Sequence, residues 1–469
     1  MKVFFCNLRI YIVQIIIVLS GCISLYSQAP PFLGGLGMEL AFYPLLVGVV
    51  FWLIGCIFFS EKVYIPKAKS FYLLLLFLIW LIFTGIANID AITESIFKGV
   101  SGSSRFIIQY CTMLFYFLSA LYIYNSIKTV IENNNILDIW ESAVYFSALI
   151  FGAYSFFEIA SLLGNQNLRE IVNFIDSMFR SDEVVGDVFA YVRIRSLTAE
   201  ASYFGMYCGV AIPWLIVHAV RTQGSGIKKI FNFAFVLYYI VLLIFSLSRT
   251  AYFMIAIELV AMFFLYRKYL IASGKKFIMY GSVMLVVLAI SVTYFISMSD
   301  VVDVDIMSVF LSFVSGNEGV HDLSNIARTG SQWAGVYIFL DNPFFGVGFG
   351  EYPYYYVEYV PAWAWISQEV QLWGSDIVGT IMTPSHGLYT RILGETGFIG
   401  LSIWLIFFCY LFIEVGNVVK NYRDIRCRCC FVTLIALCLF GFNLDAFRVF
   451  YYWIFMAFIW ALDSHVTLD

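Results

Sequence analysis

Residues 71–88 read FYLLLLFLIWLIFTGIAN, an apolar stretch of 18 residues without a charged side chain. At about 1.5 Å per residue, a helix of this length reaches about 27 Å, close to the roughly 30 Å thickness of a bilayer's hydrocarbon core. Apolar stretches of similar length recur along most of the 469-residue chain. The pattern predicts a helical protein that crosses the membrane many times.

The composition of the whole chain agrees with this prediction. Hydrophobic residues make up 62% of the sequence and charged residues 12%, about half the charged share of an ordinary soluble domain. The net charge of −4 and the isoelectric point near 5.7 offer no basic surface for nucleic acid. The composition therefore excludes a soluble globular enzyme, a disordered chain and a nucleic-acid-binding protein.

We expect an all-α polytopic protein that forms one membrane domain over residues 1–469, with about twelve transmembrane helices. The predicted spans are 10–26, 40–59, 71–88, 107–125, 139–163, 199–220, 230–247, 250–266, 277–297, 397–416, 431–444 and 449–462. The last two are short enough to form a re-entrant hairpin instead. Two long connections remain, residues 164–198 and residues 298–396, and the second is large enough to form a small domain between spans nine and ten.

Basic residues set the orientation, because cytoplasmic loops are enriched in lysine and arginine. With the N-terminus inside, short inner loops carry 17 of the 27 basic residues, and 11 of these are lysines. The outer side carries the other ten, of which nine are arginines. Both termini are therefore predicted to be cytoplasmic, with the two long connections outside. The outer arginines are compatible with chance in a small sample, or with guanidinium groups that face phosphate.

One alternative concerns the first span. Residues 19–22, LSGC, follow an apolar run with Lys2 and Arg9 upstream, and they are similar to a bacterial lipoprotein cleavage box at Cys22. Removal of the first span would leave the second span entering from outside, so the charge pattern does not exclude cleavage. Small residues are common in membrane helices, and we therefore favour an intact first span.

The large outer connection contains several patterns. The stretch NIARTGSQWAGVYIFL at 325–340 predicts a helix that contains Arg328 and ends before Pro343. Its large apolar residues have spacings compatible with one helical face, namely Ile326, Trp333, Val336, Tyr337 and Leu340. The following FFGVGFGEY, residues 344–352, predicts a tight turn with positive φ at its glycines rather than a dinucleotide site, because no strand precedes it. Residues 351–373 are rich in tyrosine and tryptophan, which fits an aromatic belt at the membrane surface or a surface that stacks on sugar rings.

Three further motifs place polar residues at the outer ends of spans. SHGLYTRILGETGFIGL puts His386 before span ten, RIRSLTAEASYFGMY puts Arg195 and Glu200 before span six, and FSLSRTAY puts Arg249 between spans seven and eight. Ionisable residues at such places are candidates for function. Each also has a structural interpretation: a polar structural histidine, an ion pair between Glu200 and Arg195, and an arginine that snorkels to the interface.

Together, SLSRTAYF, DNPFFGVGFGEY and SHGLYTRILGETGFIGL, which lie within residues 190–415, resemble motifs of the bacterial O-antigen polymerases and O-antigen ligases. The resemblance implies a fold similar to the C-type membrane glycosyltransferases, with many membrane helices and a mostly helical external loop. It implies an enzyme of the bacterial cytoplasmic membrane whose active site faces the periplasm. The implied donor is a glycan carried on undecaprenyl pyrophosphate.

The two branches of this family differ in their acceptor. A polymerase transfers the growing glycan to a new lipid-linked repeat unit, whereas a ligase transfers it to lipid A–core. A chain-length regulator is a possible partner protein. The segment AEASYFGMY leans toward the polymerases. Ala201 stands where proline is frequent, however, and His386 is a feature shared with the ligases. The sequence therefore favours a polymerase and keeps the ligase as the alternative.

The reaction of such an enzyme breaks the bond between the anomeric carbon and pyrophosphate, where negative charge then grows. The run DVVDVD at 300–305 is spaced like part of a calcium loop but lacks its glycine and distal glutamate, so we expect no metal or other cofactor. Arginines are the candidates to stabilise the leaving pyrophosphate, namely Arg195, Arg249 and Arg328. His386, and after it Glu200, is the candidate to accept the proton of the attacking sugar hydroxyl.

Two functions of other classes compete with this hypothesis. A transporter of lipid-linked sugars would also bind pyrophosphate with arginines, but such proteins often show internal repeats and helices broken near the midplane. This sequence shows no repeat, and its polar residues gather at one rim. A structural membrane scaffold would need no arginines at that rim. The sequence therefore favours a glycosyltransferase.

Overall fold

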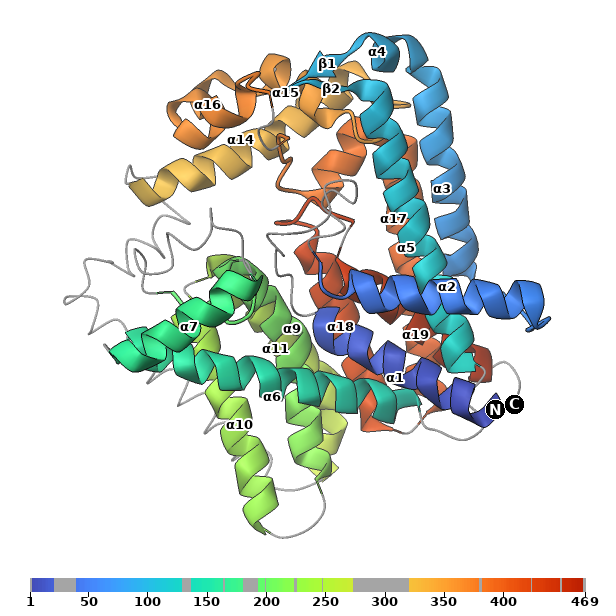
Figure 1. Cartoon of the computed structure of the whole chain (residues 1–469), viewed down its shortest axis with the longest axis vertical. Coiled ribbons are helices and arrows are strands. Elements are labelled where there is room, and N and C mark those ends of the chain that lie inside the picture. The colour runs from blue at the N-terminus through green and yellow to red at the C-terminus, as the bar shows by residue number, and fades with distance from the viewer. Residues whose placement is uncertain are drawn as a thin grey trace.

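The computed structural model describes residues 2–20, 39–128, 136–162, 165–179, 193–198, 200–222, 226–246, 248–272, 320–378, 382–422, 424–447 and 449–466. These segments are mostly helical, and two short strands, β1 (Ile96–Phe97) and β2 (Val100–Ser101), pair as an antiparallel hairpin. Figure 1 shows the helices as a bundle with a cap of shorter helices at one end.

Eleven of the twelve predicted spans overlap a helix. These helices are α1 (Lys2–Ser20), α2 (Phe42–Phe58), α3 (Lys69–Ala87), α5 (Gly102–Lys128), α6 (Ile136–Leu162), α9 (Ala201–Arg221), α10 (Gly226–Phe245), α11 (Arg249–Ala272), α17 (Leu388–Asn421), α18 (Ile425–Phe440) and α19 (Phe450–Val466). The ninth predicted span, 277–297, lies outside the described residues, as do Cys22 and the acidic run 300–305.

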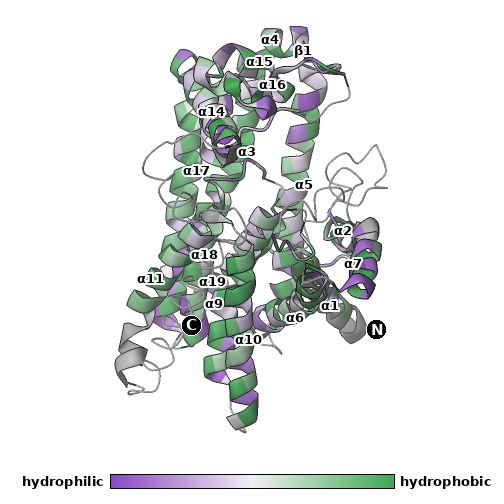
Figure 2. Ribbon diagram, turned by 90° about the vertical axis from the view of Figure 1, so that its left-hand side faces the viewer, coloured by the Kyte–Doolittle hydropathy of each residue, from purple (hydrophilic) through white to green (hydrophobic). Residues whose placement is uncertain are grey.

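The structure confirms a polytopic helical membrane protein. Six of these helices are long and apolar enough to cross a bilayer, namely α3, α5, α6, α9, α10 and α17. Shorter apolar helices lie within α1, α2, α11 and α19. Figure 2 shows hydrophobic residues along most of α3 and α17, as lipid exposure requires. The total of twelve spans and the likeness to C-type glycosyltransferases stay predictions.

An ionic cluster joins the start of α6, the end of α9 and the start of α18. Arg426 forms ion pairs with Asp138 and with Glu141, the latter at 3.1 Å. Glu141 also pairs with Arg221, and it lies 2.8 Å from a ring nitrogen of His218. The charge pattern predicted that these three helix ends share one side of the membrane, and the cluster brings them together. The assignment of that side to the cytoplasm stays a prediction.

The described part of the second long connection, residues 320–378 and 382–396, forms a helical unit with its own core. Its helices are α14 (Val320–Asp341), α15 (Tyr352–Tyr359), the 3₁₀ helix η2 (Ala362–Ile366) and α16 (Gln368–Gly374). In Figure 1 they lie beside the strand hairpin and the short helix α4 (Ile89–Glu94), at one end of α3 and α5. The expectation of a mostly helical loop thus agrees with the structure in its described part.

Several aromatic residues of this unit build its core. Tyr352 and Tyr356 are fully buried there, and the hydroxyl of Tyr352 donates to the carbonyl of Ser331 at 2.7 Å. Both predicted interpretations, an aromatic belt and a sugar-stacking surface, are wrong for these two tyrosines, because each requires an exposed ring. Trp363 is 46% exposed and remains available for either role.

The predicted helix over 325–340 is found in α14, which ends at Asp341, before the proline. Its buried face consists mostly of small residues, Ala327, Gly330, Ala334, Gly335 and Ile338. Leu340, part of the expected apolar face, is instead 62% exposed. A Cβ on Gly335 would lie 2.8 Å from the carbonyl oxygen of Thr390. Small side chains thus let α14 approach the backbone of α17.

The glycine-rich turn after α14 has the predicted conformation. Gly346, Gly348 and Gly350 have φ values of 65°, 103° and 89°, in the region that favours glycine. A Cβ on Gly346 would collide with the backbone of residues 394–396. The turn therefore packs directly against the backbone of α17.

This packing occurs where α17 bends. Gly397 has φ 68° and ψ −172°, which breaks the helical path. Backbone carbonyls next to the bend accept hydrogen bonds from outside the helix: Val347 N–H to Gly394, Gly348 N–H to Glu395 and the Trp80 indole to Thr396, each at 3.0 Å. The glycine-rich turn FFGVGFGEY and the bend GETGFIGL thus pack against each other through backbone hydrogen bonds.

Candidate active site around His386

His386 lies in the turn just before α17, with a backbone φ of +54° that is uncommon outside glycine. Its carbonyl accepts a hydrogen bond from the Gln332 amide of α14 at 2.8 Å. The N–H of the neighbouring Ser385 donates to the carboxylate of Asp445 at 2.7 Å. The imidazole lies against the Trp373 ring of α16, with centroids 4.8 Å apart. Groups from three distant parts of the chain therefore fix this turn.

The surroundings of the imidazole keep it neutral. Its Nε2 is buried and has no hydrogen-bond partner within the described part of the chain. Burial lowers the pKa of His386 to about 4, against the Asp445 carboxylate, which raises it, while Arg328 lowers it further. A neutral imidazole with an unpartnered nitrogen can accept a proton from a bound hydroxyl.

Arg328 is the candidate arginine whose described side chain acts on His386. It is half-buried on α14, four residues before Gln332, which contacts the His386 carbonyl. Residues four apart lie on the same face of a helix. The structure therefore brings together two of the five predicted site residues.

Arg195 belongs to another cluster. Arg195 is 8% exposed, and its guanidinium lies 3.6 Å from the carboxylate of Asp176, on α7 (Gln166–Phe179). Its backbone N–H donates to Glu158 of α6 at 3.1 Å. These contacts give Arg195 a local structural role in joining the segment 193–198 to α6 and α7.

Glu200 is exposed, and its carboxylate accepts a hydrogen bond from the Ser202 hydroxyl at 3.0 Å. The ion pair between Glu200 and Arg195, proposed as a structural alternative, is not formed among the described residues. Nor does any contact of His386 in this part of the chain involve Glu200 or Arg195. The two predicted proton acceptors thus lie in separate surroundings.

Arg249 is the first residue of α11, and α10 ends at Phe245, so the predicted short connection between these spans is correct. The side chain of Arg249 lies outside the described residues. The N–H of Ile194 donates to the carbonyl of Phe245 at 3.0 Å. The segment that carries Arg195 therefore lies against the connection that leads to Arg249.

Residues 234–405 match the family model described as O-antigen ligase. The match covers 172 of the 469 residues, and over this segment it supports an assignment to the O-antigen polymerases and ligases. It confirms the resemblance found in the motifs, and it includes Arg249, Arg328 and His386. No curated protein matches the chain.

The O-antigen family segment also contains a polar cluster that the sequence analysis missed. Arg391 of α17 lies 3.1 Å from both carboxylate oxygens of Glu395. Its other nitrogens donate to the carbonyl of Asp445 at 2.8 Å and to the side chain of Gln109, on α5, at 3.1 Å. The spacing of four residues between Arg391 and Glu395 in TRILGET was a readable signal for this pair.

A second missed residue of the family segment is Glu351, at the end of the glycine turn. It is 1% exposed, and its carboxyl oxygens have no hydrogen-bond partner among the described residues. A Cβ on Gly102, at the start of α5, would lie 2.7 Å from one of these oxygens. Burial and the charge of Glu395 raise the pKa of Glu351 to about 8, although Arg105 opposes the shift. Glu351 is therefore largely protonated at neutral pH.

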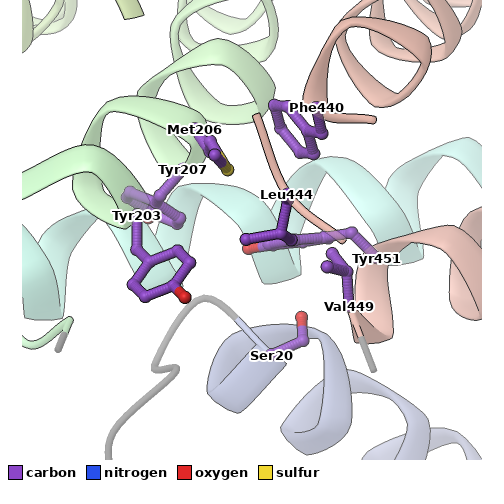
Figure 3. A pocket seen from close by; sticks show the side chains of 8 residues that line it. All are labelled: Ser20, Tyr203, Met206, Tyr207, Phe440, Leu444, Val449 and Tyr451. Carbon is purple, nitrogen blue, oxygen red and sulfur yellow. The ribbon is translucent and has the colours of Figure 1, made fainter. Parts of the chain in front are cut away.

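A small cavity lies away from His386, between α1, α9 and the residues around the α18–α19 connection. It is lined by Ser20, Tyr203, Met206, Tyr207, Phe440, Leu444, Val449 and Tyr451. Figure 3 shows Tyr203 and Tyr207 of α9 on one side of it, and Leu444 and Tyr451 on the other. Its volume of about 10 Å³ suits about one water molecule, so it cannot receive a sugar.

Proposed function

We propose that this chain is a polymerase of O-antigen or of a related surface polysaccharide in the bacterial cytoplasmic membrane. It transfers the glycan from undecaprenyl pyrophosphate to a sugar hydroxyl of a second lipid-linked repeat unit, on the periplasmic side. Enzymes of this family act on lipid-linked glycans. The observation that carries the proposal is the convergence of Arg328 and Asp445 on the neutral, partly enclosed imidazole of His386.

In the proposed reaction, the acceptor hydroxyl oxygen bonds to the anomeric carbon while the bond from that carbon to the pyrophosphate breaks. The electron pair of the broken bond leaves with the pyrophosphate, and the hydroxyl proton passes to His386. With a pKa near 4, the imidazole is unprotonated at neutral pH and can accept a proton, but it is only a weak base. Bound pyrophosphate would offset the positive charge of Arg328 and raise this pKa, so the base becomes effective once the donor is bound.

Arginines stabilise the leaving pyrophosphate in this proposal. Arg328 binds it beside His386, and Arg249 binds it at the membrane rim, because a guanidinium grips two phosphate oxygens and keeps its charge in a partly dry site. Arg195 is the third ligand, and for this arginine the carboxylate of Asp176 competes with the substrate.

The role of His386 is tested by turnover of the purified protein. His386→Ala should lower the rate by about 10²–10⁴-fold if it removes a general base. His465→Ala, near the end of α19, is the matched control for loss of a histidine. A wild-type rate for His386→Ala at normal expression would mean that Glu200 is the base, or that positioning of the acceptor hydroxyl suffices without a base.

The role of Arg249 is tested by a substitution that keeps its charge. Arg249→Lys should lower the initial rate of glycan transfer on the order of 10²-fold, the scale of losing one preorganised electrostatic donor, and Ala should be worse. Lysine snorkels as well as arginine does, so full activity of Arg249→Lys would return this residue to a structural role. Arg169→Lys, on the exposed side of α7, is the matched control.

The alternative acceptor is lipid A–core, and the description of the matching family model as O-antigen ligase favours keeping it. The lipopolysaccharide or capsule gel of a deletion strain separates the two. A single repeat unit that stays attached to core indicates a polymerase, whereas loss of every attached unit indicates a ligase. Turnover by purified protein without an energy source distinguishes either enzyme from a transporter.

A further inference from the structure

The turn that carries His386 depends on a residue outside the matched family segment. Asp445 lies in the connection between α18 and α19, forty residues beyond the end of the match at 405. One of its carboxylate oxygens accepts the N–H of Ser385 at 2.7 Å and lies 3.4 Å from the Ser385 hydroxyl. This is a side-chain anchor on the residue directly before His386.

The conformation of His386 needs such an anchor. A non-glycine residue in the left-handed region costs of order 1–3 kcal/mol and persists where its surroundings enforce it. On the other side of the turn, the Gln332 amide donates both to the His386 carbonyl at 2.8 Å and to the Phe442 carbonyl at 3.0 Å. The α18–α19 connection therefore contacts the turn through Asp445 directly and through Gln332.

Asp445 is itself placed by α17. The guanidinium of Arg391 donates to the Asp445 carbonyl at 2.8 Å and stacks over the ring of Phe447, 5.7 Å from its centroid. Because Arg391 also pairs with Glu395, the backbone of residue 445 is fixed from the helix that follows His386.

Two charged groups act on the imidazole, and they have opposite effects. The Asp445 carboxylate, from the α18–α19 connection, favours the imidazolium, and Arg328, from α14, disfavours it. The third neighbouring element, α16, contributes the uncharged ring of Trp373. Asp445 is therefore the described group whose charge would stabilise a proton on His386.

We propose that Asp445 is a positioning residue for glycan transfer: it fixes the Ser385–His386 turn, and its carboxylate stabilises the imidazolium formed when His386 takes the acceptor proton. This inference rests on the proposed role of His386 as the base. It extends the active site to the α18–α19 connection.

The test is the pH dependence of kcat at saturating donor, whose acid limb reports the base in the enzyme–substrate complex. Asp445→Asn keeps an oxygen that can accept the Ser385 N–H but removes the charge. We expect the acid limb to move about one pH unit lower and the plateau rate to fall about 10-fold, because the imidazole becomes a weaker base. Asp445→Glu, which restores the charge, should return the limb toward its wild-type position.

Asp341→Asn is the matched control for the charge change. Asp341 lies at the end of α14, and its carboxylate accepts a hydrogen bond from the Tyr359 hydroxyl. If Asp445→Asn fails to insert, Asp445→Ser carries the same expectation, since its hydroxyl can accept the Ser385 N–H. A rate that falls at every pH without movement of the acid limb would overturn the inference, because a purely structural role predicts that result.

A second measurement separates this inference from the proposed function. Histidine-selective NMR on the chain, which has four histidines, follows the titration of His386 without turnover. Arg328→Gln should raise the pH at which His386 titrates, and Asp445→Asn in that background should lower it again. An unchanged titration would overturn the inference even if His386→Ala is inactive. If the titration moves but His386→Ala turns over at the wild-type rate, the base role fails, and the catalytic role of Asp445 fails with it.

Discussion

Glu351→Gln is expected to change how stability depends on pH. The wild-type carboxyl is buried beside Gly102 without a hydrogen-bond partner among the described residues, and its pKa is raised from an ordinary 4.5 to about 8. Glutamine has nearly the same shape and does not ionise in this range. The substitution therefore removes the titration while it preserves the packing against α5.

The sign of this pH dependence follows from whether the folded or the unfolded state binds the Glu351 proton more tightly. Because the folded state has the raised pKa, unfolding releases a proton between pH 4.5 and 8, and wild-type stability falls as the pH rises through this window. The stabilisation is complete below pH 4.5. One pKa unit corresponds to about 1.4 kcal/mol, so the wild type should lose about 3 kcal/mol between pH 4.5 and pH 7, and about 4 kcal/mol by pH 8. Glu351→Gln should lack this loss.

The assay is the midpoint of thermal unfolding of the purified protein in detergent, measured from pH 5 to pH 8. The gap between Glu351→Gln and wild type should widen as the pH rises. Glu369→Gln, at an exposed position on α16, should follow the wild-type profile. Parallel profiles for Glu351→Gln and wild type would refute a buried, protonated Glu351.

Further expectations concern the bend, the enclosure of the histidine and the topology. Gly397→Ala should destabilise the fold by about 1–3 kcal/mol or more, seen as a lower unfolding midpoint, because its φ is +68° and a Cβ would collide with the carbonyl of Phe344. Trp373→Ala should admit water to the imidazole and raise the pKa of His386 toward 6.5, which histidine-selective NMR would detect; an unchanged titration would contradict this. A cysteine introduced within 417–430 should resist an impermeant reagent in intact spheroplasts, and its labelling would overturn the cytoplasmic assignment.

Much of the fold could be predicted because its signals are local. A run such as 71–88 has no alternative to a helix in lipid, and the glycines of FFGVGFGEY need positive φ whatever surrounds them. The end of α14 at Asp341 likewise follows from the proline two residues later.

The rest depends on contacts between distant residues. Hydropathy predicted that α14 would use its large apolar residues, but close approach to the Thr390 backbone selects the small ones, such as Gly335. His386 stands out in the sequence because it is a rare residue type beside a span. Asp445 does not stand out, since nothing local distinguishes its carboxylate from other acidic residues until α17 and α18 bring it to Ser385.

The turn around His386 also bears on the exchange of parts between related enzymes. Its backbone is tied at Leu388 to the carbonyl of Gly441, at 2.8 Å, and at Ser385 to Asp445, both beyond the matched segment. Gln109, far upstream, completes the contacts of Arg391. A chimera that receives residues 234–405 from a relative would therefore inherit the histidine turn without its contacts to Gly441 and Asp445. Such a chimera should also receive residues 441–447 from the same relative, because the residues that hold the His386 turn are not contiguous in the sequence.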